Sequence, residues 1–481
     1  MHIVVIGAGP TGLAAGYDLL QNGHQVTLYE QDPRWVGGIS RTVVYKGYRF
    51  DIGGHRFFSK NAEIEAYWRN ILGEDLLTRR RLSRIFYDGK FYDYPLKAGN
   101  AFKNMGLVNT AGCLGNYLKT QMFPRRPVRT FEDWVTNHFG ARLYEMFFKS
   151  YTEKVWGMPC NEISADWAAQ RIQGLSLITA VKSAVWPSGF SRQKSVKTLA
   201  DSFRYPKQGP GMLWERVASH IRSLGGDLRM GARVSCIAWE PGRGVSAVEA
   251  SGCAAQRPDH VISSMPLRSL VRALSPQPPL DVRDAAEALH YRDFITVALI
   301  VDAPHLFPDQ WIYIHDPRVK VGRIQNFKNW SADMVPDPGM TCLGMEYFCF
   351  AGDGLWTAPD RELLSLAERE ARATGLLGKA RCVDGTVVRV PKAYPVYDDH
   401  YERHLLTIRR YLDSHLPNLQ IAGRNGMHRY NNQDHAMLTG LMAAKNVSGA
   451  AYDLWAVNSD AQYLESVPST RRVPQRITVK G

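Results

Sequence analysis

The chain has 481 residues, of which 45% are hydrophobic and 22% are charged, and its formal net charge is +13. This length suffices for two domains, because a single hydrophobic core stops growing near roughly 250–300 residues. No apolar run reaches the roughly 18 residues that span a bilayer, and the short apolar N-terminus does not resemble a signal peptide. Seven scattered cysteines without a Cys-x-x-Cys pair predict free thiols, a cytoplasmic location and no metal site.

The positive charge includes two local clusters, at residues 79–84 and 125–129. Such clusters could attract a diphosphate, a glycan acid or an anionic membrane surface, although they more often simply form a solvent-exposed face of the protein. Nucleic acid is not an expected partner, because no recognised binding motif accompanies the charge.

The first thirty residues predict a dinucleotide-binding unit. An apolar strand at 2–6 leads into Gly7-x-Gly9-x-x-Gly12. Gly7 allows a tight turn, Gly9 lets backbone N–H groups approach a pyrophosphate, and Gly12 lets the next helix pack on the sheet. The residues expected to form this loop around the cofactor are Gly7, Gly9, Pro10, Thr11 and Gly12.

The elements after the loop complete this pattern. A helix at 13–22 directs its positive end toward the phosphates, and Gly23 ends it. A strand at 26–29 then leads to Glu30, which lies eighteen residues after Gly12. This is close to the roughly 20 residues expected for the acid that binds a ribose.

A second glycine pair distinguishes a flavin cofactor from a nicotinamide cofactor. Gly37 and Gly38, followed by Ile39 and Ser40, come shortly after the acidic residue. Here the chain resembles the FAD-binding superfamily of flavin amine oxidases, protoporphyrinogen oxidase, carotenoid desaturases and UDP-galactopyranose mutase. The resemblance implies non-covalent FAD, with this segment beside its pyrophosphate and ribityl chain. Arg34 is either a further phosphate contact or an exposed turn residue.

The resemblance also implies a cofactor domain split along the chain. Three later elements would add to this domain: a helix at 212–224, a strand pair at 228–239 that holds Val234, and a strand at 259–264. Gly423 and Arg424, with a helix at 436–447 whose N-terminus faces the flavin, would complete it. Val234, Gly423 and Arg424 are therefore further candidate cofactor residues.

The expected fold class is α/β, with a discontinuous Rossmann-type FAD-binding domain, an inserted helical domain and a mixed β-sheet substrate domain. The FAD-binding domain is expected in three parts, at 1–95, 201–272 and 416–460. A mainly helical substrate or lid domain is expected at 96–200, and a β-sheet substrate domain at 273–415. A flexible basic tail is expected at 461–481.

The middle of the chain narrows the resemblance. After Thr130, a plausible N-cap, helical periodicity runs over 131–148. The heptapeptide Tyr-Thr-Glu-Lys-Val-Trp-Gly at 151–157 resembles the signature of UDP-galactopyranose mutases, where the tryptophan, here Trp156, lines the sugar-nucleotide pocket. Taken alone, an aromatic helix end is more often core than site.

Other segments resemble the mutases in the same order. Gly54 and His55 match a loop that lies against the isoalloxazine ring. Arg323 matches the arginine that grips the diphosphate, a role that suits a planar, always charged guanidinium. Tyr394 and Tyr430 are candidate hydrogen-bond partners of phosphate oxygens, although each tyrosine alone is more often a core residue.

Three departures weaken UDP-galactopyranose as the substrate. Phe58 stands where the mutase loop carries a second histidine. Arg171 matches the first arginine of the next mutase helix, but Leu175 replaces the second. The acid of the family's Tyr-Tyr-Asp-Met segment is shifted or replaced at 430–434.

Three hypotheses follow. The first is a mutase-like isomerase, in which reduced flavin N5 acts on a nucleotide-linked sugar; a homo-oligomer is possible. The second is an oxidoreductase of the amine oxidase or protoporphyrinogen oxidase type that oxidises a C–N or C–C bond. Its aromatic cage would use Tyr347, Phe348, Phe350 and Trp356, although this run also suits a buried strand. Lys328 would position a water, although a surface lysine at a strand edge is the more frequent case. The third is a flavoprotein subunit retained for binding.

Overall fold

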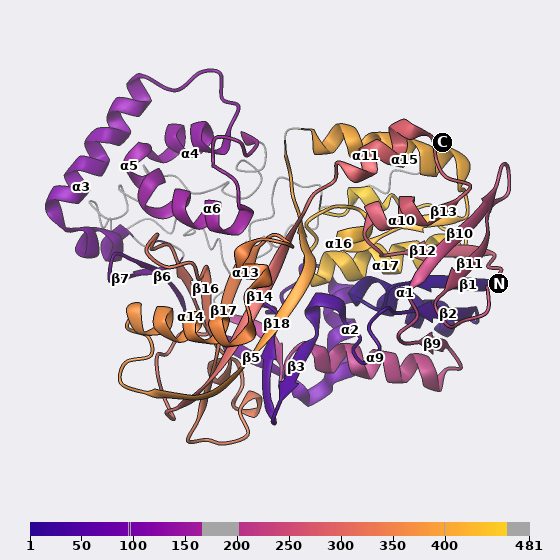
Figure 1. The fold of residues 1–481 in the computed structure, drawn as a ribbon, viewed down its shortest axis with the longest axis horizontal. Coiled ribbons are helices and arrows are strands. Elements are labelled where there is room, and N and C mark those ends of the chain that lie inside the picture. The colour runs from indigo at the N-terminus through magenta and orange to yellow at the C-terminus, as the bar shows by residue number, and fades with distance from the viewer. Residues whose placement is uncertain (95, 97, 166–201, 399, 459–481) are drawn as a thin grey trace, which may run out of the picture.

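The computed structural model describes residues 1–94, 96, 98–165, 202–398 and 400–458. Figure 1 shows three regions: a parallel sheet with its helices near the N-terminus, a larger mixed sheet, and a helical region at the opposite end. The expected α/β fold class is confirmed. Arg171, Leu175 and the basic tail lie outside the described residues.

A five-stranded parallel sheet is built from three distant parts of the chain. Its order is β19 (Leu419–Ile421), β12 (His260–Ser263), β1 (His2–Ile6), β2 (Gln25–Tyr29) and β9 (Asp227–Arg229). Alternate side chains of β1 enter two different hydrophobic clusters, Ile3 and Val5 on one face and Val4 and Ile6 on the other. A sheet covered on both faces explains its almost uniformly apolar strands. The expected discontinuous Rossmann-type unit is thus present.

The helices on one face are α1 (Pro10–Gln21), α2 (Ala62–Leu72), α9 (Gly211–Ser223) and α17 (Gln433–Val447). Two of them begin three residues before the predicted start, because α1 opens with a proline in its first turn and α17 follows directly on a loop. Proline suits that position since its missing N–H would have no helical partner.

The other face carries a small sheet and three helices: β10 (Val234–Glu240), β11 (Gly244–Ala250), β13 (Leu274–Ser275), α10 (Leu267–Ala273), α11 (Leu280–Glu287) and α15 (Tyr401–His415). The prediction of a strand pair at 228–239 was wrong in its pairing. β9 joins the parallel sheet through β2, whereas β10 pairs with β11.

A seven-stranded mixed sheet is the second large sheet of the molecule. Its order is β18 (Arg381–Pro395), β14 (Tyr291–Asp302), β17 (Thr341–Cys349), β16 (Arg323–Asn326), β15 (Trp311–Ile314), β6 (Ser83–Tyr87) and β7 (Lys90–Asp93). Only β15 and β6 pair in parallel. β6 and β7 therefore extend this sheet, although the expected division placed residues 1–95 with the cofactor; the domain division itself stays a proposal.

The remaining short elements connect these layers. They are β3 (Thr42–Tyr45), β4 (Tyr48–Asp51), β5 (Leu76–Arg80), β8 (Ser202–Pro206), α12 (Phe327–Trp330), α13 (Gly354–Thr357), α14 (Asp360–Ala373), α16 (Gly423–Gly426), η1 (Gly38–Ser40), η2 (Gly73–Asp75), η4 (Ala332–Met334) and η5 (Leu454–Ala456).

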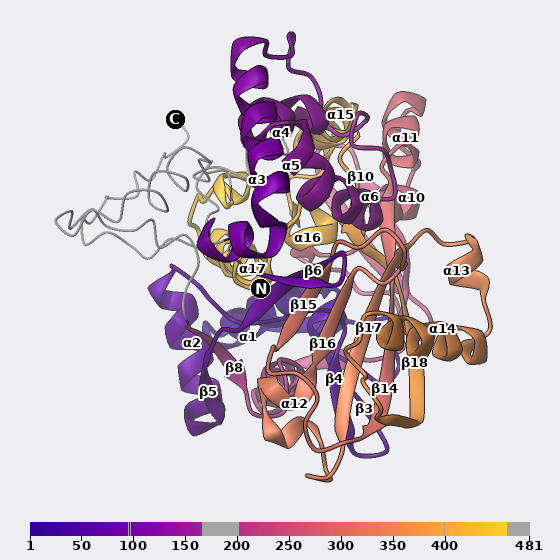
Figure 2. The same ribbon diagram turned by 90° about the vertical axis from the view of Figure 1, so that its left-hand side faces the viewer.

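The helical region holds α3 (Ala98–Met122), α4 (Phe131–Phe139), α5 (Ala141–Tyr144), the π-helical turn η3 (Glu145–Lys149) and α6 (Ser150–Trp156). Figure 2 shows these helices together above β6. Thr130 caps α4 as predicted, in a reciprocal capping box with Asp133. The predicted helical periodicity over 131–148 is interrupted at Gly140, as its glycine indicates, because Gly140 adopts a φ of 83° and ends α4.

Candidate active site

A cavity of about 1060 Å³ opens at the carboxyl ends of β1 and β2. We call it the cofactor cavity. Ten of the sequence-predicted cofactor residues line it: Gly7, Gly9, Pro10, Thr11, Glu30, Gly38, Ile39, Ser40, Val234 and Arg424. Gly12, Gly37 and Gly423 lie behind this lining, where they allow close packing of the backbone.

The three glycines of the first loop meet three different conditions. Gly7 has a φ of 97°, and a Cβ on it would lie 2.4 Å from the Ser264 hydroxyl. A Cβ on Gly12 would lie 1.9 Å from the Gly7 carbonyl oxygen, so it would separate α1 from the loop. A Cβ on Gly9 would meet nothing within 4 Å. The space above Gly9 is therefore open on the cavity side, as a bound pyrophosphate requires.

The N-terminus of α1 faces this space. Gly9 is its N-cap residue and contributes no side-chain hydrogen bond. The first N–H groups of a helix have no partner within the helix, and together with the helix dipole they attract an anion. The backbone at α1 thus fits a phosphate group.

Glu30 is fixed at the end of β2 by two backbone donors. The Ala8 N–H donates to one carboxylate oxygen at 2.8 Å, and the Asp32 N–H donates to the other at 2.9 Å. Burial raises the pKa of Glu30, while these hydrogen bonds oppose the shift. A carboxylate held in this way fits a ribose hydroxyl.

Arg41, rather than Arg34, brings a guanidinium to the cofactor cavity. Arg34 is exposed and is not among the lining residues. Arg41 lines the cavity, pairs with Asp32 at 2.7 Å, and keeps its Nε buried without a hydrogen-bond partner among the described residues. Arg41 directly follows Ser40 in the sequence, and no role was predicted for it.

The segment at the start of α17 closes the cofactor cavity. Gly423 has a φ of 81°, and a Cβ there would lie 2.3 Å from the Thr11 hydroxyl. Asn432 is the N-cap residue of α17, its side chain does not cap the helix, and both it and Gln433 of the first turn line the cavity. The buried side-chain oxygens of Asn425 and Gln433 have no hydrogen-bond partner among the described residues. These groups fit a polar ring system such as a flavin.

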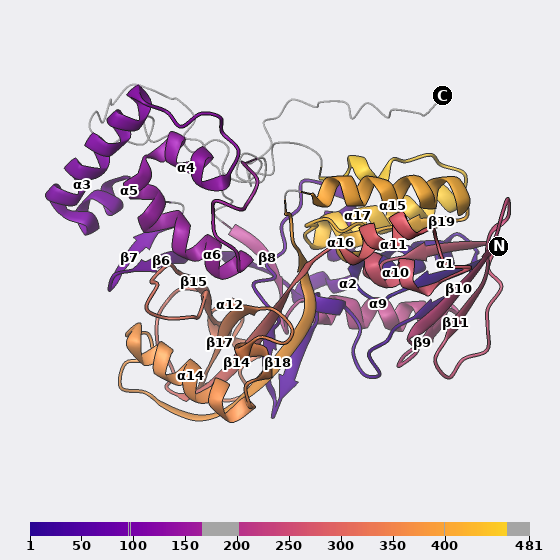
Figure 3. The same cartoon turned by 45° about the horizontal axis from the view of Figure 1, so that its top comes forward.

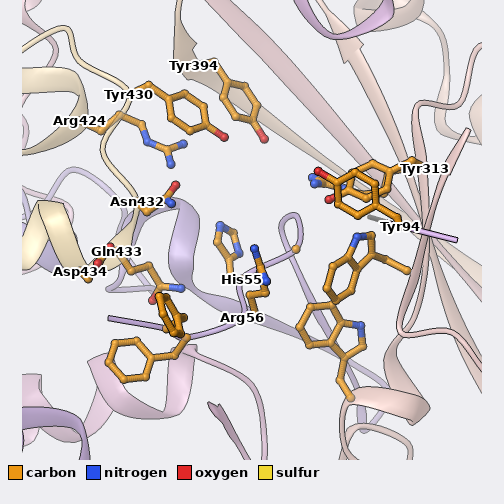
Figure 4. A pocket seen from close by; sticks show the side chains of 16 residues that line it. His55, Arg56, Tyr94, Tyr313, Tyr394, Arg424, Tyr430, Asn432, Gln433 and Asp434 are labelled. Atoms are coloured by element: carbon orange, nitrogen blue, oxygen red, sulfur yellow. The ribbon is translucent and has the colours of Figure 1, made fainter. Parts of the chain in front are cut away.

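A second cavity of about 260 Å³ adjoins the first, and we call it the substrate cavity. Arg424, Asn432 and Gln433 line both cavities. Its lining residues are Gly54, His55, Arg56, Phe57, Phe58, Tyr94, Trp311, Tyr313, Arg323, Trp330, Tyr394, Arg424, Tyr430, Asn432, Gln433 and Asp434. Figure 4 shows Tyr394, Tyr430 and Arg424 on one side of it and Tyr94 and Tyr313 on the other.

Arg323 enters the substrate cavity from β16 and is held from behind. Its Nε donates to Glu346 on β17 at 2.5 Å, and Gln325 donates to the other oxygen of that carboxylate. Although burial alone would lower it, Glu346 keeps the pKa of Arg323 well above its ordinary value. The guanidinium lies against Gly54, where a Cβ would be 3.7 Å from Nη1. The side chain is thus a fixed cation beside the glycine loop.

Two tyrosines and a second arginine form a stacked group. The rings of Tyr394 and Tyr430 lie 5.7 Å apart at 13°, and the Arg424 guanidinium lies 4.7 Å from the Tyr430 ring centre. Burial raises the pKa of Tyr394 to about 12. Its hydroxyl is therefore protonated at neutral pH and can donate a hydrogen bond to an anion.

His55 is partly buried near Arg424 and Arg323. Burial, with the charges of Arg424 and Arg323, lowers its pKa to about 3. The ring is therefore neutral at physiological pH, and its Nδ1 has no hydrogen-bond partner among the described residues. Figure 4 shows the ring directed into the cavity.

A buried carboxyl supports the loop that carries His55. Asp51 accepts hydrogen bonds from Tyr205 at 2.6 Å and from Thr42 at 2.9 Å. Burial raises its pKa to about 7, against these hydrogen bonds. Gly53 follows with a φ of 105°, which turns the chain toward the cavity.

Trp156 is not brought to the substrate cavity. It ends α6, is 5% exposed and stacks on Tyr397 with ring centres 6.3 Å apart. It belongs to the hydrophobic cluster of the helical region. Tyr94 and Tyr313, which line the substrate cavity, pack against the same cluster. Trp156 therefore lies next to the lining without being part of it, and its contact with a sugar nucleotide stays a prediction.

The aromatic cage of the oxidase hypothesis is also absent from the described lining. Tyr347, Phe348, Phe350 and Trp356 do not line either cavity. Tyr347 is fully buried in β17 and donates to Glu370. Tyr347 and Phe348 thus follow the buried-strand alternative, whereas Phe350 comes just after β17 and is 37% exposed, and Trp356 lies on α13.

The Lys328 side chain, on α12, is bound to backbone carbonyl groups. Its ammonium group donates to the carbonyl oxygens of Pro304, Pro338 and Met340. It holds two loops together, and it lines neither cavity.

Sequence reasoning missed the aromatic and polar residues that complete the substrate cavity. The missed residues are Arg56, Tyr94, Trp311, Tyr313, Trp330, Asn432, Gln433 and Asp434. Arg56 follows directly on the Gly-His pair, so its position next to a predicted site residue was an available signal. Trp311, Tyr313 and Trp330 carry no motif; the sheet order brings the first two here on β15, and Trp330 ends the short helix α12 that follows β16.

Comparisons with known proteins identify the family. A family model described as flavin containing amine oxidoreductase matches residues 10–448. The chain belongs to this family. FAD is therefore the implied cofactor, and the protein is an enzyme of the FAD-dependent oxidoreductase superfamily.

Solved structures share the whole fold at low sequence identity. A reduced UDP-galactopyranose mutase superposes with a TM-score of 0.82 at 23% identity, covering 97% of this chain and 99% of that one. A candidate protoporphyrinogen oxidase from Exiguobacterium sp. 255-15 superposes with a TM-score of 0.70 at 17% identity, covering 93% and 98%. At these identities the likeness establishes the fold alone.

Sequence similarity to curated relatives is short. A probable zeta-carotene desaturase from Synechococcus elongatus is 35% identical over 71 residues, which is 15% of this chain and 15% of the relative. The described residues contain no helix long and apolar enough to cross a membrane. Within those residues no group of three His, Cys, Asp or Glu side chains could hold a metal ion.

Proposed function

We propose that the protein is an FAD-dependent enzyme that acts on a nucleotide-linked sugar in the manner of a UDP-galactopyranose mutase. The substrate cavity carries the proposal, because three arginines line it: Arg56, Arg323 and Arg424. Among the lining residues that the structure describes, the one carboxyl belongs to Asp434, whose pKa burial raises. Such a cavity favours a substrate with concentrated negative charge, as in a diphosphate.

The arginines have separate tasks. Arg323 is paired through Nε, which leaves the outer nitrogens of its fork on the cavity side near Gly54. We assign it to the leaving diphosphate, whose growing charge it would stabilise. Arg424 lines both cavities and stacks on Tyr430, so it would join the substrate diphosphate to the cofactor side.

The neutral groups orient the sugar. Tyr394 and Tyr430 can donate hydrogen bonds to phosphate oxygens, and the neutral ring of His55 can bond a sugar hydroxyl. Reduced FAD, when bound, would supply a nucleophilic nitrogen beside the anomeric carbon. The reaction then needs no paired carboxylates from the protein.

An amine substrate fits the cavity poorly. A cationic amine would face three guanidinium groups and only one carboxyl of raised pKa. Like charges at close range cost binding free energy. Net oxidation of an amine is therefore kept as the opposing outcome of the test.

The test compares redox states. The purified holoenzyme, reduced with dithionite under anaerobic conditions, is incubated with UDP- and dTDP-hexoses, and the products are separated by chromatography. We expect a sugar-nucleotide isomer from reduced enzyme and none from oxidised enzyme. Turnover by oxidised enzyme alone, with oxygen or quinone consumed, would show that the proposed function is wrong.

A further inference from the structure

We infer that α3 is a docking surface for an anionic lipid membrane. The helix lies in the helical region, at the end of the molecule opposite the parallel sheet in Figures 1 and 3. Gly106 interrupts it with a φ of 77°, so the part from 107 to 122 is a separate straight segment. At 1.5 Å per residue this segment is about 24 Å long.

One face of this segment is an apolar stripe exposed to solvent. It consists of Leu107, Ala111, Leu114, Leu118 and Met122. Their spacing of four, three, four and four residues places them in one row along a helix. Leu107 is 90% exposed, Leu118 is 54% exposed and Met122 is 67% exposed. Val108 and Phe123 border the stripe and are also exposed.

The opposite face already packs on the protein. Cys113, Tyr117 and Thr120 are buried, and they follow the same helical spacing on the far side. Cys113 belongs to the hydrophobic cluster that holds α4 and α5. The stripe is therefore not needed to attach α3 to its neighbours, and a row of exposed apolar side chains marks an interaction surface.

The charge around the stripe selects the partner. Residues 94–131 contain six lysines and arginines and no aspartate or glutamate. Lys119 is exposed beside the stripe, and Arg126 and Arg129 are exposed just after the helix. Arg125 pairs with Glu132 at 2.8 Å, so part of the charge is balanced. An apolar face flanked by cations is the pattern that binds an anionic bilayer surface.

A second copy of the chain fits this surface less well. A two-fold interface through the stripe would place the cations of one copy against those of the other. Crossing the bilayer is not part of the inference, because no described helix is long and apolar enough to span it. The segment would lie along the lipid surface with the stripe inserted.

The inference is independent of the proposed substrate and is tested by vesicle sedimentation. Full-length holoenzyme is mixed with vesicles of phosphatidylcholine alone or with one third phosphatidylglycerol. We expect binding to the anionic vesicles that weakens as salt is added. Leu114→Ser/Leu118→Ser should weaken binding by about tenfold or more, because each leucine loses its apolar burial. Lys119→Glu should weaken it less.

Leu280→Ser is the matched control, since Leu280 is 62% exposed on α11, away from the stripe. It should bind vesicles like the wild type. All variants should keep their flavin absorbance and melting temperature. Wild-type protein that does not bind anionic vesicles overturns the inference. Equal loss of binding in the Leu280 control, or a wild-type dimer that dissociates in the double variant without vesicle binding, also overturns it.

Discussion

The cofactor cavity and the substrate cavity share three residues but are built in different ways. The cofactor cavity is shaped by backbone: glycines at Gly7, Gly9 and Gly12, and the N-termini of α1 and α17. The substrate cavity is shaped by side chains from separated segments, among them Arg323 on β16 and Tyr394 on β18. Backbone geometry demands a fixed residue type, whereas a charged cavity can be assembled from many positions. Substitutions should therefore affect the two cavities differently.

Gly12→Val should have the largest effect, because it would break the cofactor region itself. Its Cβ would lie 1.9 Å from the Gly7 carbonyl oxygen. We expect little folded protein and no bound flavin, measured by circular dichroism melting and by the ratio of flavin absorbance to protein absorbance. A stable variant with full flavin content would contradict the packing argument.

Gly9→Ala is the matched variant that separates folding from cofactor binding. Its Cβ would meet no protein atom within 4 Å, and the φ of −78° at Gly9 is open to alanine. The apoprotein should melt like the wild type, while FAD affinity falls because the methyl group enters the phosphate space. Unchanged FAD affinity in a direct titration would argue against a pyrophosphate at this loop.

Arg323→Ala should break the substrate cavity and leave the cofactor cavity intact. We expect kcat/KM for a nucleotide sugar to fall by about a hundredfold or more, with full FAD content. The change also leaves Glu346 buried without its partner, at a cost of about 3–5 kcal/mol in stability. Arg323→Met/Glu346→Gln should recover stability without recovering activity. Recovery of both stability and activity in the double variant would show that Arg323 has a structural role only. Loss of flavin in Arg323→Ala would show that Arg323 belongs to the cofactor cavity and not to the substrate cavity.

Asp51→Asn should change how the stability of the protein depends on pH. Burial raises the pKa of Asp51 from 3.8 to about 7 in the folded protein. The folded state then binds this proton more tightly than the unfolded state, so the carboxyl lowers stability as pH rises from about 4 to 7. The melting temperature of the variant relative to wild type should rise across this window and level off above it. A constant difference would show that Asp51 does not titrate there.

His55→Gln should have the smallest effect. Because its pKa is lowered to about 3, His55 is neutral above about pH 5 and does not act as a titrating acid or base. We expect turnover to fall by about tenfold through a lost hydrogen bond, with the same pH profile as wild type between about pH 5 and 8. An inflection near neutral pH that disappears in the variant would contradict a neutral role.

Most of the residues predicted to hold the cofactor line one cavity, because their positions are set by local sequence. Gly7 and Gly9 lie on one turn, and Glu30 follows one helix and one strand later, so spacing alone predicted their neighbourhood. The role of Arg41 was not predicted, because both Arg41 and Arg34 lie near Asp32. Only the folded loop decides which of the two guanidinium groups reaches the cavity.

The substrate cavity was predicted in part and only through resemblance. His55, Arg323, Tyr394 and Tyr430 line it together, yet nothing in their spacing indicates this. Trp156 stands in a matching heptapeptide and packs in the cluster of the helical region, beside the lining residues Tyr94 and Tyr313. Strand order, which the periodicity of single strands does not encode, places Arg323 and Tyr394 in one sheet.

Flavin difference spectroscopy tests the central claim most directly. Oxidised holoenzyme is titrated with UDP, with UDP-galactose, with free galactose and with a diamine of similar size. We predict that both UDP compounds perturb the flavin spectrum with saturation, that galactose does so weakly, and that the diamine does not. A saturable response to the diamine, with bleaching of the flavin and none to UDP, would contradict an anion-binding substrate cavity.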